Sequence, residues 1–257
     1  MSVIPPNGAR LLQITDTHLF ADPTAALADI VPEARFRATL QAMRPWAATA
    51  EALLHTGDLV HDGSPEGYQR LREALTSLGL PGRVTPGNHD HRDRLQPAFA
   101  SGPVNGERVM RMGEWSVIVL DSLQSGEVPG HLAEAELTAL DRALADCTTP
   151  YCLVALHHPP FPVGTAWLDA IGLDNPGPLV ERLNADPRVR AVLCGHVHMA
   201  FDGRLNGCRT LTTPATAAQF LAGAEVFAID RGPPGFRWLD LRSDGGIDTG
   251  VMRVPVN

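Results

Sequence analysis

Short apolar runs alternate with amphipathic stretches along most of this 257-residue chain, and that alternation constrains the fold more than any other feature. Apolar runs of about four to eight residues indicate buried strands, whereas apolar side chains three and four residues apart indicate helices. We expect strands at residues 10–14, 52–54, 82–85, 115–121, 151–156 and 189–194. We expect helices between several of them, at residues 32–48, 65–78 and 133–145. Strands that alternate with helices predict an α/β fold.

The pattern changes after Cys208, where β-rich segments replace the alternation. Strand-like composition covers residues 209–213, 225–230, 236–241 and 247–254. No internal repeat, low-complexity stretch or linker interrupts the chain, and its Pro/Gly-rich pieces indicate loops. With 44% hydrophobic and 19% charged residues, we expect one domain over residues 1–257 that buries one substantial core.

Charge and hydropathy argue against several classes of protein. The formal charge of −8 argues against a nucleic-acid surface that relies on counterion release, although local charge at a site can still attract a small anion. No run approaches the roughly 18 apolar residues of a membrane span, and residues 1–10 lack a signal-peptide core. We therefore expect a cytoplasmic protein with no membrane segment. The four cysteines show no C-x-x-C spacing and are expected to be reduced core residues.

Polar side chains that can bind metal ions come just after the apolar runs. Seven such candidates follow five runs: Asp16, His18, Asp58, Asn88, His157, His196 and His198. In open α/β sheets, ligands bind outside the carboxyl ends of the strands, where loops and helix N-termini converge. Side chains that follow five separate strands can therefore meet, and the pattern predicts a two-metal site. Glycines precede Asp58, Asn88 and His196, which supplies permissive backbone where the chain turns off a strand.

The ligand types indicate hard to borderline divalent or trivalent ions. Carboxylate and amide oxygens favour manganese, iron or magnesium, whereas imidazole favours zinc, iron or cobalt, so the set leaves Fe, Mn and Zn open. The absence of cysteine from the set argues against a structural zinc site. Two divalent ions less the charges of Asp16, Asp58 and one hydroxide leave about +1, which attracts a phosphodiester anion.

The five blocks Asp-x-His, Gly-Asp, Gly-Asn-His-Asp, His-His-Pro and Gly-His-x-His resemble, in this order, the signature of the calcineurin-like metallophosphoesterases. Longer strings at residues 11–20, 157–160, 167–169 and 193–198 are similar to bacterial class III cyclic nucleotide phosphodiesterases of the cyclic-AMP type. Related glycerophosphodiesterases carry almost the same metal blocks. The resemblance implies an α/β fold of four layers, an α/β/β/α sandwich of two mixed sheets flanked by helices.

The resemblance also implies how the ligands are divided between two metals. The first metal would be held by Asp16, His18, Asp58 and His198. The second would be held by Asp58, Asn88, His157 and His196, with Asp58 as the bridge. A hydroxide shared by the metals would attack phosphorus in line, while His89 would stabilise the charged transition state or protonate the leaving oxygen.

Neighbouring polar residues have less specific roles. We expect His158 to support the ligands or to line the pocket, and His55 to be a satisfied, partly buried histidine. Asp90 is expected to orient its loop or the adjacent histidine rather than to bind metal. His61 is a candidate pocket residue. For Asp121 the sequence leaves two roles open: support of the site, or a cap at the end of a strand.

The sequence predicts a dinuclear metal-dependent phosphodiesterase that hydrolyses 3′,5′-cyclic nucleotides, with a small anionic phosphodiester as substrate. Hydrolysis of glycerophosphodiesters or other small diesters is the alternative, because residues 21–35 match cyclic-AMP enzymes weakly. A non-catalytic metal-binding scaffold is less favoured, since all seven ligands and His89 are present. A DNA nuclease is less favoured because the chain is acidic. The oligomeric state is open, with a homodimer among the alternatives.

Overall fold

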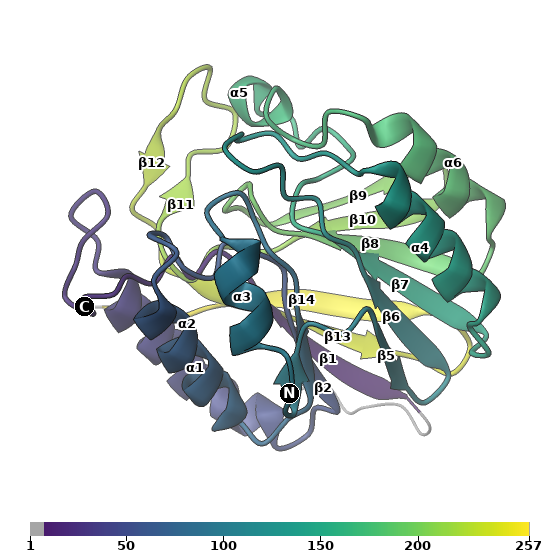
Figure 1. Ribbon diagram of the computed structural model, residues 1–257, viewed down its shortest axis with the longest axis horizontal. Coiled ribbons are helices and arrows are strands. Elements are labelled where there is room, and N and C mark those ends of the chain that lie inside the picture. Colours follow the sequence, from purple (N-terminus) through teal and green to yellow (C-terminus); the bar gives the residue numbers. More distant parts are fainter. Residues whose placement is uncertain (1–7, 257) are drawn as a thin grey trace.

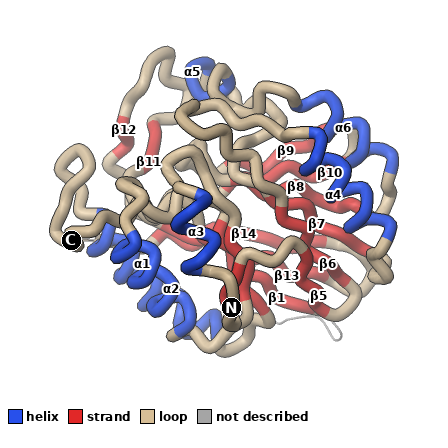
Figure 2. The backbone as a smooth tube through the Cα atoms, in the orientation of Figure 1, coloured by secondary structure: helices blue, strands red, loops and turns tan. Residues whose placement is uncertain are grey.

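The structure, a computed structural model that describes residues 8–256, contains two six-stranded mixed sheets (Figures 1 and 2). The first sheet consists, in spatial order, of β14 (Ile247–Arg253), β13 (Gly235–Leu241), β1 (Ala9–Ile14), β2 (Ala52–His55), β3 (Gly82–Val84) and β4 (Val104–Asn105). The second consists of β5 (Val109–Met112), β6 (Trp115–Val119), β7 (Tyr151–Ala155), β8 (Val189–Cys194), β10 (Cys208–Thr212) and β9 (Phe201–Leu205). A separate hairpin pairs β11 (Gln219–Phe220) with β12 (Ile229–Asp230).

Helices cover the outer face of each sheet. Those on the first sheet are α1 (Pro32–Ala47), α2 (Pro65–Thr76) and α3 (Arg92–Ala98). Those on the second sheet are α4 (Glu134–Ala145), α5 (Ala166–Asp169) and α6 (Pro176–Ala185). Figure 1 shows the two groups of helices on opposite sides of the packed sheets. The expected α/β/β/α order of layers is therefore confirmed.

Three apolar layers hold this arrangement together, and β1 shows how they are built. Successive side chains of a strand point to opposite faces. Leu12 and Ile14 accordingly pack against the helices, while Leu11 packs between the two sheets, and all three are fully buried. Strands buried on both faces read as continuous apolar runs rather than alternating ones, which is why these segments stood out in the sequence.

Local signals set the start of α2. Pro65 occupies the first turn, and the Ser64 hydroxyl accepts a hydrogen bond from the Gly67 amide at 3.3 Å. Serine before a proline is a favoured helix start because it satisfies an amide that has no partner within the helix. The predicted N-cap is confirmed.

Two expectations about elements were incomplete. The strand predicted at residues 225–230 is wrong for most of its length, since only Ile229–Asp230 pairs and residues 221–228 form a loop. Val226 and Phe227 are 72% and 61% exposed, so these apolar side chains are not part of the hydrophobic core. The helices α3, α5 and α6 were not predicted from the sequence, because they are short and have few buried side chains.

The carboxyl ends of the central strands meet at one edge of the sandwich. In the first sheet β1, β2 and β3 are parallel, with Ile14 beside His55 and His55 beside Val84. In the second sheet β7 and β8 are parallel, with Ala155 beside Leu193. The loops after these five strands therefore converge, as expected for ligands at strand ends.

Two further expectations concern the whole chain. Among residues 8–256, every helix is too short or too polar to cross a membrane. The expectation of one domain over residues 1–257 stays a prediction, and residues 1–7 and 257 lie outside the described part of the chain.

Candidate metal centre

Most of the candidate ligands have a strained backbone. Five of the seven have positive φ angles: Asp16 at 53°, His18 at 45°, Asp58 at 53°, His196 at 70° and His198 at 49°. Such angles are uncommon outside glycine and cost on the order of 1–3 kcal/mol each unless the surrounding structure holds them in place. Strain that is concentrated in converging loops is typical of functional sites.

The glycines before the ligands provide space more than conformational freedom. Only Gly57 has a positive φ, at 99°, whereas Gly87 and Gly195 do not. A Cβ on Gly195 would lie 2.7 Å from the Thr56 carbonyl oxygen and 2.9 Å from Asp16 Oδ2. The expected need for permissive backbone is therefore confirmed for Gly57 only. The other two glycines allow loops from the two sheets to touch.

Four side chains form the first group, namely Asp16, His18, Asp58 and His198, with one ligand atom of each within 4.8 Å of the others. His198 Nε2 lies 3.2 Å from Asp16 Oδ1 and 3.2 Å from His18 Nε2. His18 Nε2 lies 3.5 Å from Asp58 Oδ2. The structure thus brings together the four residues that the family resemblance places around one metal, although their assignment as its ligands stays a prediction.

A second group adjoins the first through Asp58. Asp58 Oδ2, close to His18 in the first group, also lies 3.4 Å from His157 Nε2. His196 Nδ1 lies 3.1 Å from Asn88 Oδ1, and His157 and His196 belong to one cluster of potential ligands. Asp58 therefore lies between the two groups, which is the position that a bridging carboxylate requires.

Two buried nitrogens indicate that a metal fits this second group. The Nε2 atoms of His157 and His196 have no hydrogen-bond partner among the described residues. Buried polar atoms are nearly always paired, because an unpaired one costs about 1–3 kcal/mol. A coordinated ion would satisfy both nitrogens.

Hydrogen bonds behind the histidines fix which nitrogen faces the site. His157 Nδ1 lies 2.7 Å from the Thr56 carbonyl oxygen, and His198 Nδ1 lies 2.7 Å from the Ala218 carbonyl oxygen. A carbonyl only accepts, so each Nδ1 carries a proton and each Nε2 is turned towards the carboxylates of the site. Metal-binding histidines are usually oriented in this way.

Electrostatics keeps several groups of the site in the form that a metal ion requires, but not His157. Burial would lower the pKa of His157, and the neighbouring Asp58 and Asp16 outweigh burial and raise it to about 9, so a metal ion must displace a proton from this ring. Burial lowers the pKa of His196 to about 3, so its imidazole is neutral at physiological pH. Burial alone would raise the pKa of Asp58, but His157 and His18 outweigh this effect and hold it well below its usual range. Neutral imidazoles beside ionised carboxylates are the forms that bind divalent ions.

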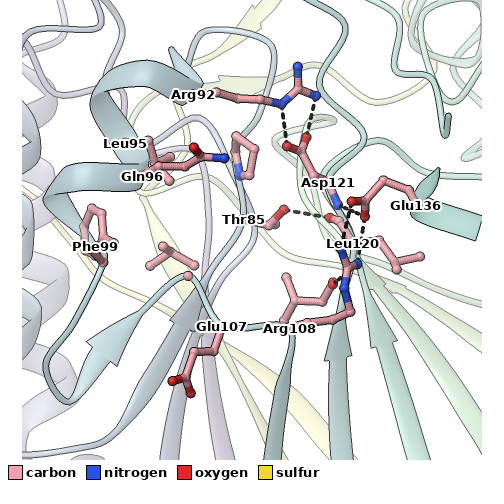
Figure 3. A pocket seen from close by; sticks show the side chains of 15 residues that line it. Thr85, Arg92, Leu95, Gln96, Phe99, Glu107, Arg108, Leu120, Asp121 and Glu136 are labelled. Atoms are coloured by element: carbon pink, nitrogen blue, oxygen red, sulfur yellow. Dashed lines mark hydrogen bonds and ion pairs between the residues drawn. The ribbon is translucent and has the colours of Figure 1, made fainter. Parts of the chain in front are cut away.

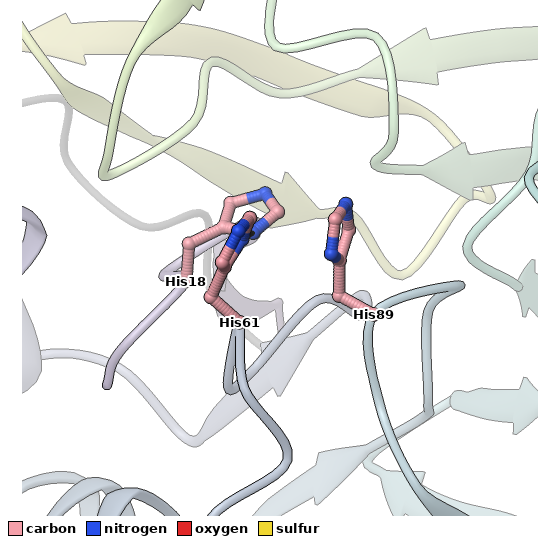
Figure 4. Close-up of side chains that lie close together, drawn as sticks. All are labelled: His18, His61 and His89. Carbon is pink, nitrogen blue, oxygen red and sulfur yellow. Dashed lines mark hydrogen bonds between the residues drawn. The ribbon is translucent and has the colours of Figure 1, made fainter. Parts of the chain in front are cut away.

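His89 lies at the edge of the same site (Figure 4). Its ring stacks on His61, with centroids 4.5 Å apart and planes at 21°, and it meets the His18 ring edge-on at 4.8 Å. The His89 amide donates to Asp58 Oδ1 at 2.9 Å, so the residue is fixed to the central carboxylate through its backbone. Both His89 and His61 line the cavity, which confirms His61 as a pocket residue.

Two neighbouring histidines lie beside the candidate ligands. His158 uses both ring nitrogens, with Nδ1 2.8 Å from Ser122 Oγ and Nε2 3.1 Å from the Val128 carbonyl oxygen. His55 was expected to be partly buried and satisfied, but it is fully buried. Its Nε2 lies 3.1 Å from Thr17 Oγ1, whereas its Nδ1 has no partner among residues 8–256, so that expectation was wrong.

Asp90 holds its loop, as expected. Its carboxylate accepts from the amides of Leu59, at 3.0 Å, and Gly87, at 2.9 Å. It also accepts from the Tyr68 hydroxyl at 2.9 Å. Asp90 therefore ties the loop after β2 to the loop after β3, and thereby fixes the spacing of Asp58 and Asn88.

Asp121 belongs to a different cavity, of about 460 Å³, which Figure 3 shows. Its carboxylate accepts from Arg92 Nε at 2.5 Å and from Arg92 Nη2 at 2.9 Å. The neighbouring Glu136 is paired in the same way with Arg108, at 2.8 Å for each contact. Asp121 thus joins α3 to the end of β6 and contacts none of the candidate ligands.

The aromatic residues of the site had no predicted role. Trp167, Phe220 and Phe227 line the cavity that contains the ligands, and Phe220 stacks on His198 at 4.0 Å with planes at 8°. Trp167 lies in one of the strings that resemble cyclic-AMP enzymes, which was the available signal. The other two have no regular spacing and could not be connected to the site without the fold.

Comparisons with known proteins identify the family of this chain. Residues 9–200 match the calcineurin-like phosphoesterase family. The chain is 38% identical over 244 residues to a 3′,5′-cyclic adenosine monophosphate phosphodiesterase from Pseudomonas aeruginosa, covering 95% of this chain and 89% of that protein. It is 36% identical to a 3′,5′-cyclic-nucleotide phosphodiesterase from Nostoc, covering 95% of this chain and 92% of that protein.

Solved structures show the same fold at low sequence identity. A dimetal phosphatase from Danio rerio superposes with a TM-score of 0.66 at 13% identity, covering 96% of this chain and 99% of that chain. The protein TT1561 of Thermus thermophilus superposes with a TM-score of 0.61 at 14% identity, covering 96% of this chain and 100% of that chain. Because residues 9–200 match this family, and relatives that match 95% of the chain are 38% and 36% identical to it, the chain belongs to the calcineurin-like phosphoesterase family.

Proposed function

We propose that this protein hydrolyses 3′,5′-cyclic nucleotides, cyclic AMP above all, at a site that holds two metal ions. The observation that carries the proposal is the contact of Asp58 Oδ2 with both ligand groups, 3.5 Å from His18 and 3.4 Å from His157. Relatives that cover 95% of the chain and are named as cyclic-AMP phosphodiesterases support the substrate. The ions themselves are Fe, Mn or Zn in this proposal.

The chain contributes a rigid, charged cradle for this reaction. Two bound divalent ions would supply the positive charge that activates water and neutralises a phosphodiester. The buried carboxylates of Asp16 and Asp58 and the nearby imidazoles would hold these ions. Hydrogen bonds to the backbone fix the orientations of Asp16 and His157.

His89 is the proposed catalytic side chain. It is half-buried at the rim of the cavity, and its backbone is anchored to Asp58. From there its ring can donate a hydrogen bond to the ester oxygen that leaves when the cyclic phosphate opens. This donation stabilises the negative charge that develops on the leaving oxygen.

A substrate comparison tests the proposal against its main alternative, a glycerophosphodiesterase. We expect kcat/KM for cyclic AMP to exceed kcat/KM for glycerophosphoethanolamine by at least about tenfold, since tenfold corresponds to a single favourable contact of about 1.4 kcal/mol. A higher kcat/KM for glycerophosphoethanolamine would instead identify the protein as a glycerophosphodiesterase. The predicted cytoplasmic location and a homodimer remain separate proposals, testable by fractionation and by size-exclusion chromatography with light scattering.

A further inference from the structure

The cavity of the metal centre extends beyond the ligands into an apolar recess. Its volume is about 450 Å³, within the range of about 300–1,000 Å³ that is usual for small-molecule sites. The inner part is lined by ligands such as His18, Asp58 and His196. The outer part is lined by apolar side chains, among them Leu27, Val128, Trp167, Phe220, Phe227 and Ile229. The site therefore has room for a group larger than the phosphate.

Three rings in this recess form one cluster, here named the aromatic wall: Trp167, Phe220 and Phe227. The centroid of Trp167 lies 5.1 Å from that of Phe220 and 5.4 Å from that of Phe227, and the two phenylalanine centroids are 5.5 Å apart. Trp167 comes from α5, Phe220 from β11 and Phe227 from the loop before β12, elements that lie together in Figure 1. Segments far apart in sequence thus build a single surface.

The aromatic wall is attached to the metal centre. Phe220 lies flat on the ring of His198, at 4.0 Å and 8°. Phe227 is 61% exposed, so packing of the hydrophobic core does not explain an aromatic side chain at that position. An exposed ring that lines a cavity next to buried ligands is placed to contact whatever the ligands hold.

The chemistry of the recess selects among possible occupants. Among the described residues that line the cavity, the ionisable side chains are Asp58 and the histidines of the inner part. The outer part therefore offers no carboxylate to the ammonium group of a glycerophosphoethanolamine. A nucleobase, in contrast, has flat π faces that stack on aromatic side chains and needs no charged partner.

We propose that the aromatic wall is the nucleobase subsite of this enzyme. It recognises the base by stacking, so it distinguishes nucleotides from base-free phosphate esters and tolerates different bases. This inference rests on the proposed function and deepens it, because the ligands bind the phosphate while Trp167, Phe220 and Phe227 bind the base. Stacking on an aromatic side chain changes affinity by about 5- to 100-fold per base.

Two ligands that differ only in the base test this directly. AMP and ribose 5-phosphate share the sugar phosphate, and their dissociation constants can be measured by calorimetry on the manganese-loaded protein. We expect AMP to bind about 5- to 100-fold more tightly than ribose 5-phosphate. Phe227→Ala should lower that ratio severalfold and leave the affinity for ribose 5-phosphate within about twofold of wild type, and Phe227→Trp should restore the ratio.

Val226→Ala is the matched control, because Val226 is the neighbouring exposed apolar residue, 72% exposed, and does not line the cavity. It should leave both affinities unchanged. Equal binding of AMP and ribose 5-phosphate by the wild type would overturn the inference. Phosphocholine binding that exceeds ribose 5-phosphate binding and disappears in Phe227→Ala would also overturn it, since the wall would then hold a quaternary ammonium group.

Measuring cyclic-AMP hydrolysis on the same samples separates the two proposals. A wild type that hydrolyses cyclic AMP without preferring AMP over ribose 5-phosphate contradicts only the nucleobase subsite. A wild type that prefers AMP but does not hydrolyse cyclic AMP contradicts only the proposed function.

Discussion

Gly87 lies so close to Asp58 that a Cβ at position 87 would be 2.5 Å from the Asp58 amide nitrogen, a separation that real Cβ atoms essentially never show. The same Cβ would lie 2.7 Å from His157 Nε2. The added methyl group of Gly87→Ala must therefore displace the central carboxylate or a neighbouring ligand. We expect a loss of stability of about 1–3 kcal/mol together with reduced metal content, measured by thermal unfolding and by elemental analysis.

Gly177→Ala is the control for that experiment. Gly177 lies in the first turn of α6, and a Cβ there would meet nothing within 4 Å. Alanine favours helices over glycine, so this variant should retain full metal content and be at least as stable as the wild type. Normal metal content in Gly87→Ala would show that the two loops can separate without damage to the site.

Asn88→Ala is expected to weaken the second metal. The Asn88 side-chain oxygen lies 3.1 Å from His196 Nδ1 and is the only amide among the candidate ligands. Loss of supporting partners alone typically reduces metal affinity or activity by about 10- to 100-fold, so loss of a ligand should reduce turnover by about 100-fold or more. Elemental analysis should find about one ion fewer per chain, and unchanged metal content would remove Asn88 from the ligand set.

His89→Ala, in contrast, should lower turnover without loss of metal. Because His89 lines the cavity and is anchored to Asp58 through its backbone amide, truncating its ring leaves that hydrogen bond in place. Loss of a general acid typically lowers turnover by about 10²- to 10⁴-fold, and we expect kcat to fall within this range while both metals stay bound. Loss of the metals along with activity would contradict the proposed division of roles.

That the candidate ligands come together was predictable from the sequence, because the signals are local. Each ligand follows an apolar run, and strands that are buried on both faces are easily recognised by such runs. The left-handed backbone at Asp16 was not predictable, since the Asp16 carbonyl accepts a hydrogen bond from the amide of Ala217, in a loop that follows a strand of the other sheet. The strand expected at residues 225–230 failed for a related reason, because the apolar character of Phe227 could not show whether the ring faces a core or a cavity.

A buried ion pair far from the metal centre supports the first sheet. Arg10 on β1 donates to both carboxylate oxygens of Asp240 on β13, at 2.6 and 2.8 Å, and the two side chains are 1% and 2% exposed. Removing one partner of a buried pair typically costs about 3–5 kcal/mol, because the other charge stays buried. Asp240→Ala should lose that much stability in urea unfolding.

The exposed pair of Arg182 and Asp141, at 2.8 Å, provides the comparison. Asp141→Ala should cost less than about 1 kcal/mol, since water screens the charges of exposed pairs. If the two substitutions lower the free energy of unfolding equally, burial does not decide how much the Arg10–Asp240 pair contributes to stability.

Counting bound metal ions while recording turnover tests the two-metal site most directly. Protein stripped by a chelator should be folded and inactive towards cyclic AMP, and stepwise addition of manganese or iron should restore activity as two ions bind per chain. Turnover should reach its maximum only when the second ion is bound, because Asp58 adjoins both ligand groups. Full activity without metal, or saturation of activity and binding at one ion per chain, would contradict a dinuclear centre.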